Sequence, residues 1–386
     1  MAMVSYNMVE SKLLFVMNKV PGRRYLGRCP GCTSRASSAG TIPIQNISPT
    51  TRVSPTQPHT MSLSRSHRLL PRASRIRTFT TSTHRRQTPP TTCSPTCACA
   101  GTPPDLDIDR TTPLLHTMAP YTEQVVLCTG KDDWSSRIDD EDSAAGDFVR
   151  GLGAEIGRGG KGFDPFTNVL TTLSSLPAST TPHTTTALLF PSFKRISAIP
   201  NTSDAYAAFA TAYLKARTLH PAHAGLTPEQ KAVLTRDESL ATRLPPAEPL
   251  VKPTVLICGH GGRDTHCGVL GPLLHARFRE AFAKRDIDAE VGLISHIGGH
   301  KYAGNVIVYL PPGMEGNAWA GSGIWYGRVG PDNAEDVVEE TVVGGKVIFE
   351  LLRGGITRDG RDIARMLEPP REEEGLKLRP KARARA

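Results

Sequence analysis

The sequence predicts an α/β fold in which strands and helices alternate through two similar halves. Short apolar runs rich in β-branched residues, such as Thr254–Cys258 and Val306–Leu310, are typical of buried strands. Apolar side chains recur at helical spacing in Gly268–Arg285. The order strand, Cys, glycine-containing loop, Asp occurs at Glu123–Asp133 and again at Val255–Asp264, which favours an internal duplication.

Positive charge is concentrated near the N-terminus of the chain. The 386 residues carry a formal net charge of +9, yet no Asp or Glu lies between Ser11 and Pro104, and the charges are mixed from Asp105 onward. Aromatic residues make up only 6% of the chain, so a nucleic-acid binder is the function class that we least expect. No apolar run reaches the roughly 18 residues of a membrane span, and none is predicted.

Residues 61–87 have the composition of a mitochondrial presequence. Arg and Ser recur, acidic residues are absent, and the segment contains the Arg-x-Phe-x-x-Ser spacing of matrix processing sites. We therefore expect recognition by the mitochondrial import machinery, residence in the matrix and a mature N-terminus between Phe79 and Arg86. The expected start codon is Met61 rather than Met1, because the presequence begins at this internal methionine. The alternative is a basic disordered arm.

The cysteines of the N-terminal region give only weak evidence of a redox or metal-binding role. Eight cysteines without a secretory apolar segment do not indicate a secreted disulfide framework. The Cys29–Cys32 pair has C-x-x-C spacing but no flanking strand or helix, so we attribute it to chance. Cys93, Cys97 and Cys99 lie in a Pro/Thr-rich linker, where exposed thiols are favoured and a redox or metal role stays open. We expect residues 1–118 to be disordered.

Residues 119–250 are predicted to form a first, degenerate thioredoxin-like half. A Ser/Asp start favours one of its helices, and a Pro-rich stretch marks its end. The expected elements are strands at Glu123–Cys128 and Thr184–Pro191, helices at Ser136–Gly151 and Thr202–Thr218, and a short helix from Thr227.

Residues 251–355 are predicted to form a second half, followed by a charged tail at 356–386. The element order strand, loop, helix, three strands, helix is a thioredoxin-like arrangement. Cys267 is expected just before a helix, where the N-terminal N–H groups favour thiolate. Beyond the elements named above, we expect strands at Asp288–Ser295 and Ile324–Val329, the latter being the last, and a helix from Pro331 towards Leu352.

The residues most suited to chemistry in this half are Cys258, Cys267, His296 and His300. Each pair follows a predicted strand, where one sheet would bring the pairs together. Thiolate and imidazole are ligands for zinc or an iron–sulfur centre. The Gly-Gly between the histidines breaks any helix, so we expect a chelating loop. No Gly-rich nucleotide loop of known spacing, nucleophile–base set or carboxylate pair for glycoside hydrolysis is recognisable.

Two motifs carry a resemblance to a known family. Cys-x-His-x-x-Arg-Asp-x-x-Cys-Gly, followed by His-x-Gly-Gly-His-x-x-Ala-Gly-Asn, resembles the sucrase/ferredoxin-like family of thioredoxin-fold [2Fe–2S] proteins. The resemblance implies a [2Fe–2S] cluster with Cys258 and Cys267 on one iron and His296 and His300 on the other. His266 departs from the basic Arg or Lys that the family pattern leads us to expect.

These observations favour a mitochondrial electron carrier or redox sensor, with a role in thiol quality control, over a self-sufficient enzyme. Neutral imidazole ligands leave a cluster less negative than four thiolates and so raise its reduction potential. Its partner would be a redox protein that the sequence does not identify. Two alternatives use the same residues: a zinc-stapled binding module and a thiol–disulfide oxidoreductase. Cys258 and Cys267 lack the C-x-x-C spacing of the latter.

Overall fold

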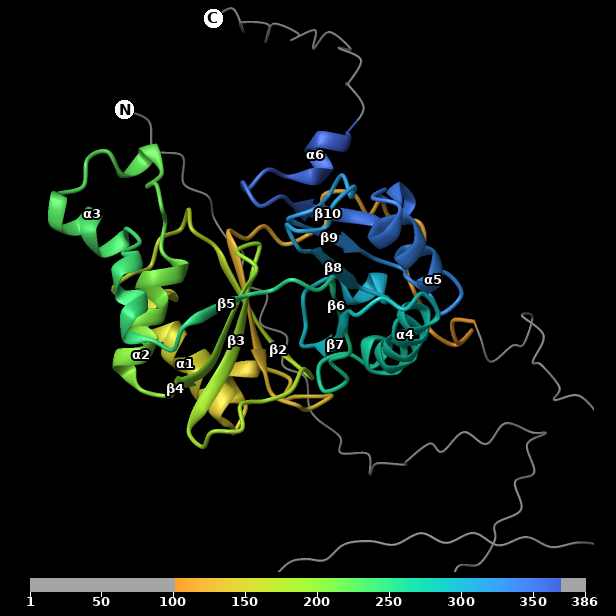
Figure 1. Cartoon of the computed structure of the whole chain (residues 1–386), viewed down its shortest axis with the longest axis horizontal. Helices are drawn as coiled ribbons and strands as arrows, with labels where there is room; N and C mark the ends of the chain where they lie inside the picture. The colour runs from red at the N-terminus through yellow and green to blue at the C-terminus, as the bar shows by residue number, and fades with distance from the viewer. Residues whose placement is uncertain (1–100, 369–386) are drawn as a thin grey trace, which may run out of the picture. The chain divides into compact units, whose positions relative to one another are not determined.

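A computed structural model describes residues 101–368, all within one compact unit. Their strands form a ten-stranded mixed sheet with the order β10-β9-β8-β6-β7-β2-β1-β3-β4-β5. Helices pack on this sheet in both halves (Figure 1). The predicted α/β class with thioredoxin-like topology is confirmed. The expected presequence at 61–87 and the cysteines between Cys29 and Cys99 lie outside the described residues.

The first half has the strand order β2-β1-β3-β4. β1 (Glu123–Cys128) is parallel to β2 (Val169–Ser174) and antiparallel to β3 (Thr184–Phe190), which pairs with β4 (Lys194–Pro200). Helix α1 (Ala144–Ile156) makes the crossover from β1 to β2. Parallel neighbours need such a crossover, because a tight turn cannot join them.

Shorter elements complete this half. α2 (Ser203–Phe209) continues into a π-helical turn at Ala210–Leu214. α3 (Pro228–Leu234) begins with a capping box, in which Thr227 and Gln230 satisfy each other's backbone N–H groups. β5 (Ala247–Pro249) then pairs with β4 at the edge of the sheet.

The second half repeats the topology as β7-β6-β8-β9. β6 (Thr254–Cys258) is joined through α4 (Thr265–Lys284) to its parallel neighbour β7 (Glu290–Ile294). β8 (Val306–Leu310) and β9 (Ser322–Tyr326) follow as antiparallel strands. The predicted bounds of β6 and β8 match the structure.

The end of the second half differs from the prediction. The strand expected at Ile324–Val329 lies at β9 and is not the last. The helix that we expected to run towards Leu352 is α5 (Ala334–Asp336) with a π-helical turn at Val337–Val343. β10 (Leu352–Ile356) and α6 (Ile363–Leu367) come after it. β10 escaped prediction because Leu-Arg-Gly-Gly-Ile has low strand propensity.

Several further elements were missed or displaced. β2, β4 and β5 were not predicted, and two helices begin away from their expected positions, α1 later and α4 earlier. Short 3₁₀ helices occupy Ile138–Asp140, Pro221–His223, Glu238–Arg243, His300–Tyr302 and Phe349–Leu351.

The halves meet where β2 pairs with β7 through Ser174 and Ile294. Buried hydroxyl groups also join them: Tyr309 lies 2.7 Å from Tyr121 between their phenolic oxygens, and the indole of Trp325 donates to Tyr121 over 3.1 Å. The two thioredoxin-like halves therefore share one sheet and one continuous core.

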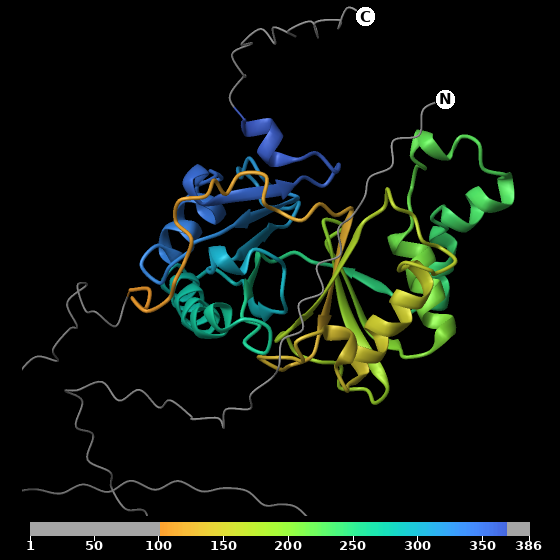
Figure 2. The same cartoon turned by 180° about the vertical axis from the view of Figure 1, so that it is seen from behind.

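Residues 101–122 lie across the second half before entering β1 (Figure 2). The backbone N–H of Asp109 donates to the carbonyl of Lys301 over 2.9 Å, and Arg328 donates to the carbonyl of Thr112 over 2.6 Å. Our expectation of disorder up to residue 118 is therefore wrong for residues 101–118, which these hydrogen bonds hold against the second half. In the part of the chain that the structure describes, no helix has the length and apolar character needed to span a membrane.

Candidate metal centre

Cys258 and His296 reach the same edge of the sheet because their strands are parallel neighbours. Cys258 is the last residue of β6 and pairs with Ile294, the last residue of β7. His296 follows two positions later, and its side chain helps to lower the pKa of Cys258. The carboxyl ends of adjacent parallel strands thus bring a thiol and an imidazole together.

Cys267 approaches Cys258 from the first turn of α4. Asp264 caps this helix, and its carboxylate accepts the backbone N–H of His266 over 3.0 Å and that of Cys267 over 3.4 Å. The helix start lies tight on the preceding loop, since a Cβ added at Gly268 would lie 2.5 Å from the Cα of Gly261. Close backbone approach of this kind requires glycine.

The two thiols differ in how readily they ionise. The pKa of Cys258 lies well below its ordinary value because the Cys267 thiol hydrogen-bonds to its sulfur, with a further contribution from His296. That same hydrogen bond, together with burial, raises the pKa of Cys267. Our expectation that the helix N-terminus favours thiolate at Cys267 is wrong: the neighbouring Cys258 and burial raise the pKa of Cys267, and the charge of Asp264, which caps the helix, raises it further.

His260 holds the loop after β6 against two other segments. Its Nε2 contacts the carbonyl oxygens of Trp134 at 3.2 Å and Ser135 at 2.9 Å, while its Nδ1 lies 3.0 Å from the backbone nitrogen of His296. Carbonyls accept and the backbone N–H donates, so the ring is neutral with its proton on Nε2. The side chain is only 1% exposed. His260 therefore orients the loop that carries His296.

The histidine loop turns through two glycines in the left-handed region. Gly298 has φ of 79° and Gly299 has φ of 73°. This turn places the ring centroids of His296 and His300 5.9 Å apart, with their planes inclined by 36°. The sequence-based expectation of a loop rather than a helix holds here.

Arg353 is a buried cation beside the thiols, contributed by the unpredicted strand β10. It is 1% exposed, and its guanidinium donates to the carbonyl of Gly298 over 3.1 Å and to the side-chain oxygen of Asn305 over 2.8 Å. It also donates to Thr117 through Nε and Nη2. All these acceptors are neutral. Burial lowers the pKa of Arg353 to about 10, and attraction to Cys258 and Cys267 opposes that change.

The structure thus places Cys267 and His296 near Cys258, whose pKa both of them lower, with His300 beside His296. Within residues 101–368, no group of three or more His, Cys, Asp or Glu side chains is arranged to hold a metal ion. The donor set fits a soft metal centre in chemistry: two thiols, two imidazoles and a buried cation that favours thiolate.

Two other predicted features take ordinary structural positions. His266 is partly exposed, and its Nδ1 lies 3.0 Å from the carboxylate of Asp264. Cys128 occupies the equivalent of Cys258 in the first half, but burial raises the pKa of its thiol to about 12. Its region of the first half therefore favours a neutral thiol.

Arg353 is the residue of the candidate site that sequence reasoning missed. Arginine is seldom fully buried unless its guanidinium has partners. An Arg within a predicted buried strand would therefore have pointed to a polar site, had the strand been recognised. Because the low strand propensity of residues 352–356 concealed β10, the position of Arg353 could not be predicted either.

Comparison with known proteins yields one family match and several relatives. The sequence model of the family described as sucrase/ferredoxin-like matches residues 114–354, which is more than half of the chain. Relatives named "Altered inheritance of mitochondria protein 32" include one from Debaryomyces hansenii, 46% identical over 105 residues, which cover 27% of this chain and 36% of the relative. Another, from Clavispora lusitaniae, is 47% identical over 109 residues, covering 28% of this chain and 36% of the relative. The match therefore spans about a third of the length of these curated relatives.

Among solved structures, a thioredoxin-like [2Fe–2S] ferredoxin from Aquifex aeolicus is similar to part of the chain. The sequence identity is 18% and the TM-score is 0.21, with 26% of this chain and 89% of the ferredoxin covered.

Proposed function

Because the chain belongs to the sucrase/ferredoxin-like family, we propose that it is a one-electron redox protein with a [2Fe–2S] cluster held by Cys258, Cys267, His296 and His300. Family and fold support a redox-type or related role. The observation that carries the finer proposal is the convergence of Cys258, Cys267 and His296 at one edge of the sheet, where the pKa of Cys258 is lowered and the buried guanidinium of Arg353 lies nearby. When bound, such a cluster supplies reversible one-electron oxidation and reduction.

The candidate ligands differ in their exposure to solvent: the cysteines are buried, whereas the histidines reach the surface. Cys258 is 2% exposed and Cys267 is fully buried, so their thiolates are shielded from water. His296 is partly exposed and His300 is exposed. Electron transfer to another protein needs a short path, and the histidine side offers it. We therefore assign docking of a redox partner to the surface around His300.

Arg353 has two functions in this proposal. Its charge favours thiolate at Cys258 and Cys267, and its hydrogen bond to the Gly298 carbonyl fixes the loop between the histidines. Both effects are present in the folded protein without metal, because the fold itself places Arg353 near the donor atoms. The neutral imidazoles then keep the centre less negative than four thiolates would.

Mitochondrial residence is part of the proposal. The relatives are named for the inheritance of mitochondria, and residues 61–87 have a presequence composition. The test is N-terminal sequencing of the protein from isolated mitochondria. A mature end between Phe79 and Arg86 supports import and cleavage into the matrix, whereas an intact Met1 or Met61 contradicts it.

The cluster itself is tested by anaerobic purification of residues 88–386, followed by a visible spectrum and by iron, sulfide and zinc analysis. The proposal requires about two irons and two acid-labile sulfides per chain. Zinc in place of iron, without sulfide, would favour the zinc-stapled module.

A thiol–disulfide oxidoreductase is the second candidate, favoured by the hydrogen bond between Cys267 and a Cys258 thiol of lowered pKa. Its mechanism requires a substrate disulfide to reach a thiolate, and both sulfurs are buried. Reduction of a disulfide substrate by iron-free protein, lost in Cys258→Ser, would establish this candidate instead.

A further inference from the structure

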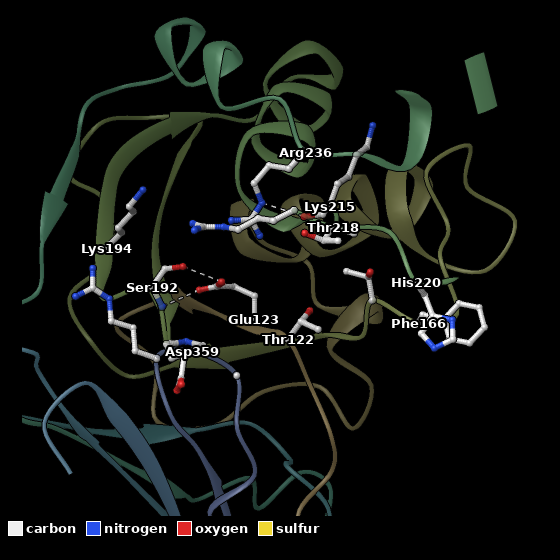
Figure 3. Close-up of a pocket in the computed structure, with 16 residues that line it drawn as sticks. Thr122, Glu123, Phe166, Ser192, Lys194, Lys215, Thr218, His220, Arg236 and Asp359 are labelled. Atoms are coloured by element: carbon white, nitrogen blue, oxygen red, sulfur yellow. Dashed lines mark hydrogen bonds between the residues drawn. The ribbon is translucent and has the colours of Figure 1, made fainter. Parts of the chain in front are cut away.

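One unassigned feature of the described residues is a cavity of about 580 Å³ between the first half and the turn after β10. The beginning of β1, the turn between β3 and β4, the segment after α2 and the turn after β10 line it (Figure 3). None of the four candidate cluster ligands belongs to its lining. We call this cavity the basic pocket. Its volume lies within the roughly 300–1,000 Å³ that is typical of small-molecule sites.

Cations dominate the lining of the basic pocket. Five Lys and Arg residues face two acidic ones, and Asp359 is already paired with Arg361 over 2.7 Å. Within residues 101–368, only one of the five cations forms an ion pair with a carboxylate, the exposed contact of Arg217 with Glu238 at 3.4 Å. The cations are Lys194, Lys215, Arg217, Arg236 and Arg358.

Arg236 is fixed at the wall of the basic pocket. Its Nε donates to the carbonyl of Lys215 over 2.9 Å, which fixes the guanidinium beside the cavity. Burial lowers its pKa and the nearby charge of Arg217 lowers it further, whereas attraction to Glu123 and Glu238 opposes this change. Holding such like charges together costs free energy, and a bound anion would offset that cost.

The buried acid of the pocket does not neutralise this charge through an ion pair. Glu123 is 4% exposed, and its two carboxylate oxygens accept the backbone N–H of Ser192 over 3.1 Å and its hydroxyl over 2.8 Å. Figure 3 shows this Ser192–Glu123 pair between Lys194 and Arg236. Lys194 itself lies over the ring of Tyr213, 5.2 Å from its centroid. The ammonium and guanidinium groups therefore remain available to a ligand.

An aromatic surface lies at another end of the same cavity. Phe166 is 46% exposed and stacks on His220, with ring centroids 3.9 Å apart and planes inclined by 4°. Figure 3 shows this stacked pair apart from Lys194 and the Ser192–Glu123 pair. An exposed flat ring held rigid by a partner is suited to stacking with a planar ligand.

We propose that the basic pocket binds a nucleotide, with its phosphates on the Lys194, Arg236 and Arg358 side and its base on Phe166. A phosphate chain matches the excess of unpaired cations, and a purine or pyrimidine ring matches the aromatic surface. One molecule carries both chemistries at separate ends, as the pocket does. This site is separate from the candidate cluster ligands and does not depend on them.

The test is calorimetric titration of the full-length protein with ADP, pyrophosphate and adenosine. ADP is expected to bind at least about tenfold more tightly than either fragment, because both ends of the pocket contribute. Pyrophosphate binding as tightly as ADP would overturn the nucleotide assignment. Absence of heat with all three probes at millimolar concentration would overturn the site.

Matched variants locate the binding. The double substitution Lys194→Gln with Arg358→Gln is expected to weaken ADP and pyrophosphate by roughly tenfold or more. Phe166→Ala is expected to weaken ADP but not pyrophosphate. The control removes two exposed cations elsewhere, Arg277→Gln with Lys346→Gln, and is expected to bind like the wild type. Equal weakening in the control would mean that net charge alone attracts the anion, which contradicts the proposal.

Discussion

The backbone N–H of His296 donates a 3.0 Å hydrogen bond to Nδ1 of His260, a ring whose Nε2 is fixed by two carbonyl oxygens of the first half. One candidate ligand is thus positioned through a histidine that is not itself a ligand. The first half, in which burial raises the pKa of Cys128, supplies the carbonyls of Trp134 and Ser135. This relationship gives the degenerate half a structural role at the centre.

His260→Ala should therefore mainly lower the free energy of unfolding, with little effect on metal binding, because His260 is not a candidate ligand. It leaves two buried carbonyls and one N–H without a partner, and we expect a loss of about 2 kcal/mol in the free energy of unfolding. His266→Ala is the matched control, since that ring is partly exposed, and it should cost less than about 1 kcal/mol. Urea unfolding of both iron-free variants measures the difference. Equal losses would mean that the hydrogen bonds of His260 contribute nothing special.

The two glycines between the histidines provide a second comparison. Both have positive φ, so replacement by Ala should cost about 1 kcal/mol at either position. At Gly299 the new Cβ would also lie 2.7 Å from Nη2 of Arg353, whereas nothing lies within 4 Å at Gly298. Gly299→Ala should therefore lower the melting temperature more than Gly298→Ala. The reverse order would show that Arg353 moves aside freely.

The thiols should be separable by replacement with serine. Cys258→Ser or Cys267→Ser should abolish iron and sulfide binding, because a hydroxyl is a far poorer ligand than thiolate. Cys128→Ser is the control, since that buried cysteine lies at the equivalent strand end of the first half. Iron analysis of the three variants decides the matter, and similar iron loss in all of them would refute the assignment of the site.

The histidines are tested by exchanging them for cysteine. The double variant His296→Cys with His300→Cys keeps two soft ligands on the same loop, so a cluster should still form. Its reduction potential should fall, because two thiolates replace two neutral imidazoles. A redox titration with a visible spectrum measures this. An unchanged potential and spectrum would remove both histidines from the ligand set.

Arg353→Gln should also lower the reduction potential, because a nearby positive charge favours the more negative, reduced state. Arg328→Gln is the control: that guanidinium binds the carbonyl of Thr112 and should affect stability without changing the potential. Arg353→Lys retains the charge and should restore most of the potential even if it loosens the histidine loop. If Arg353→Lys and Arg353→Gln shift the potential equally, the charge is not the cause.

Local sequence patterns were enough to predict several elements of the fold. Continuous apolar runs specified β1, β6 and β8 to the residue, and the Gly-Gly step specified a loop at His296–His300. In the second half, the predicted order strand, loop, helix, three strands, helix was sufficient to indicate the thioredoxin-like topology, because parallel strands joined by a crossover helix have few possible arrangements. In the first half β2 and β4 were missed.

The groups that complete the site from distant parts of the chain could be identified only from the folded structure. β10 has weak strand propensity, and its Arg353 is stable there through Thr117, which lies 236 positions earlier in the chain. The acidity of Cys258 rather than Cys267 follows from a thiol–thiol hydrogen bond and from the cap at Asp264. The basic pocket likewise joins segments from Thr122 to Gly360. Hydrophobic periodicity encodes which face of an element is buried, whereas the electrostatic environment of a side chain depends on neighbours that only folding supplies.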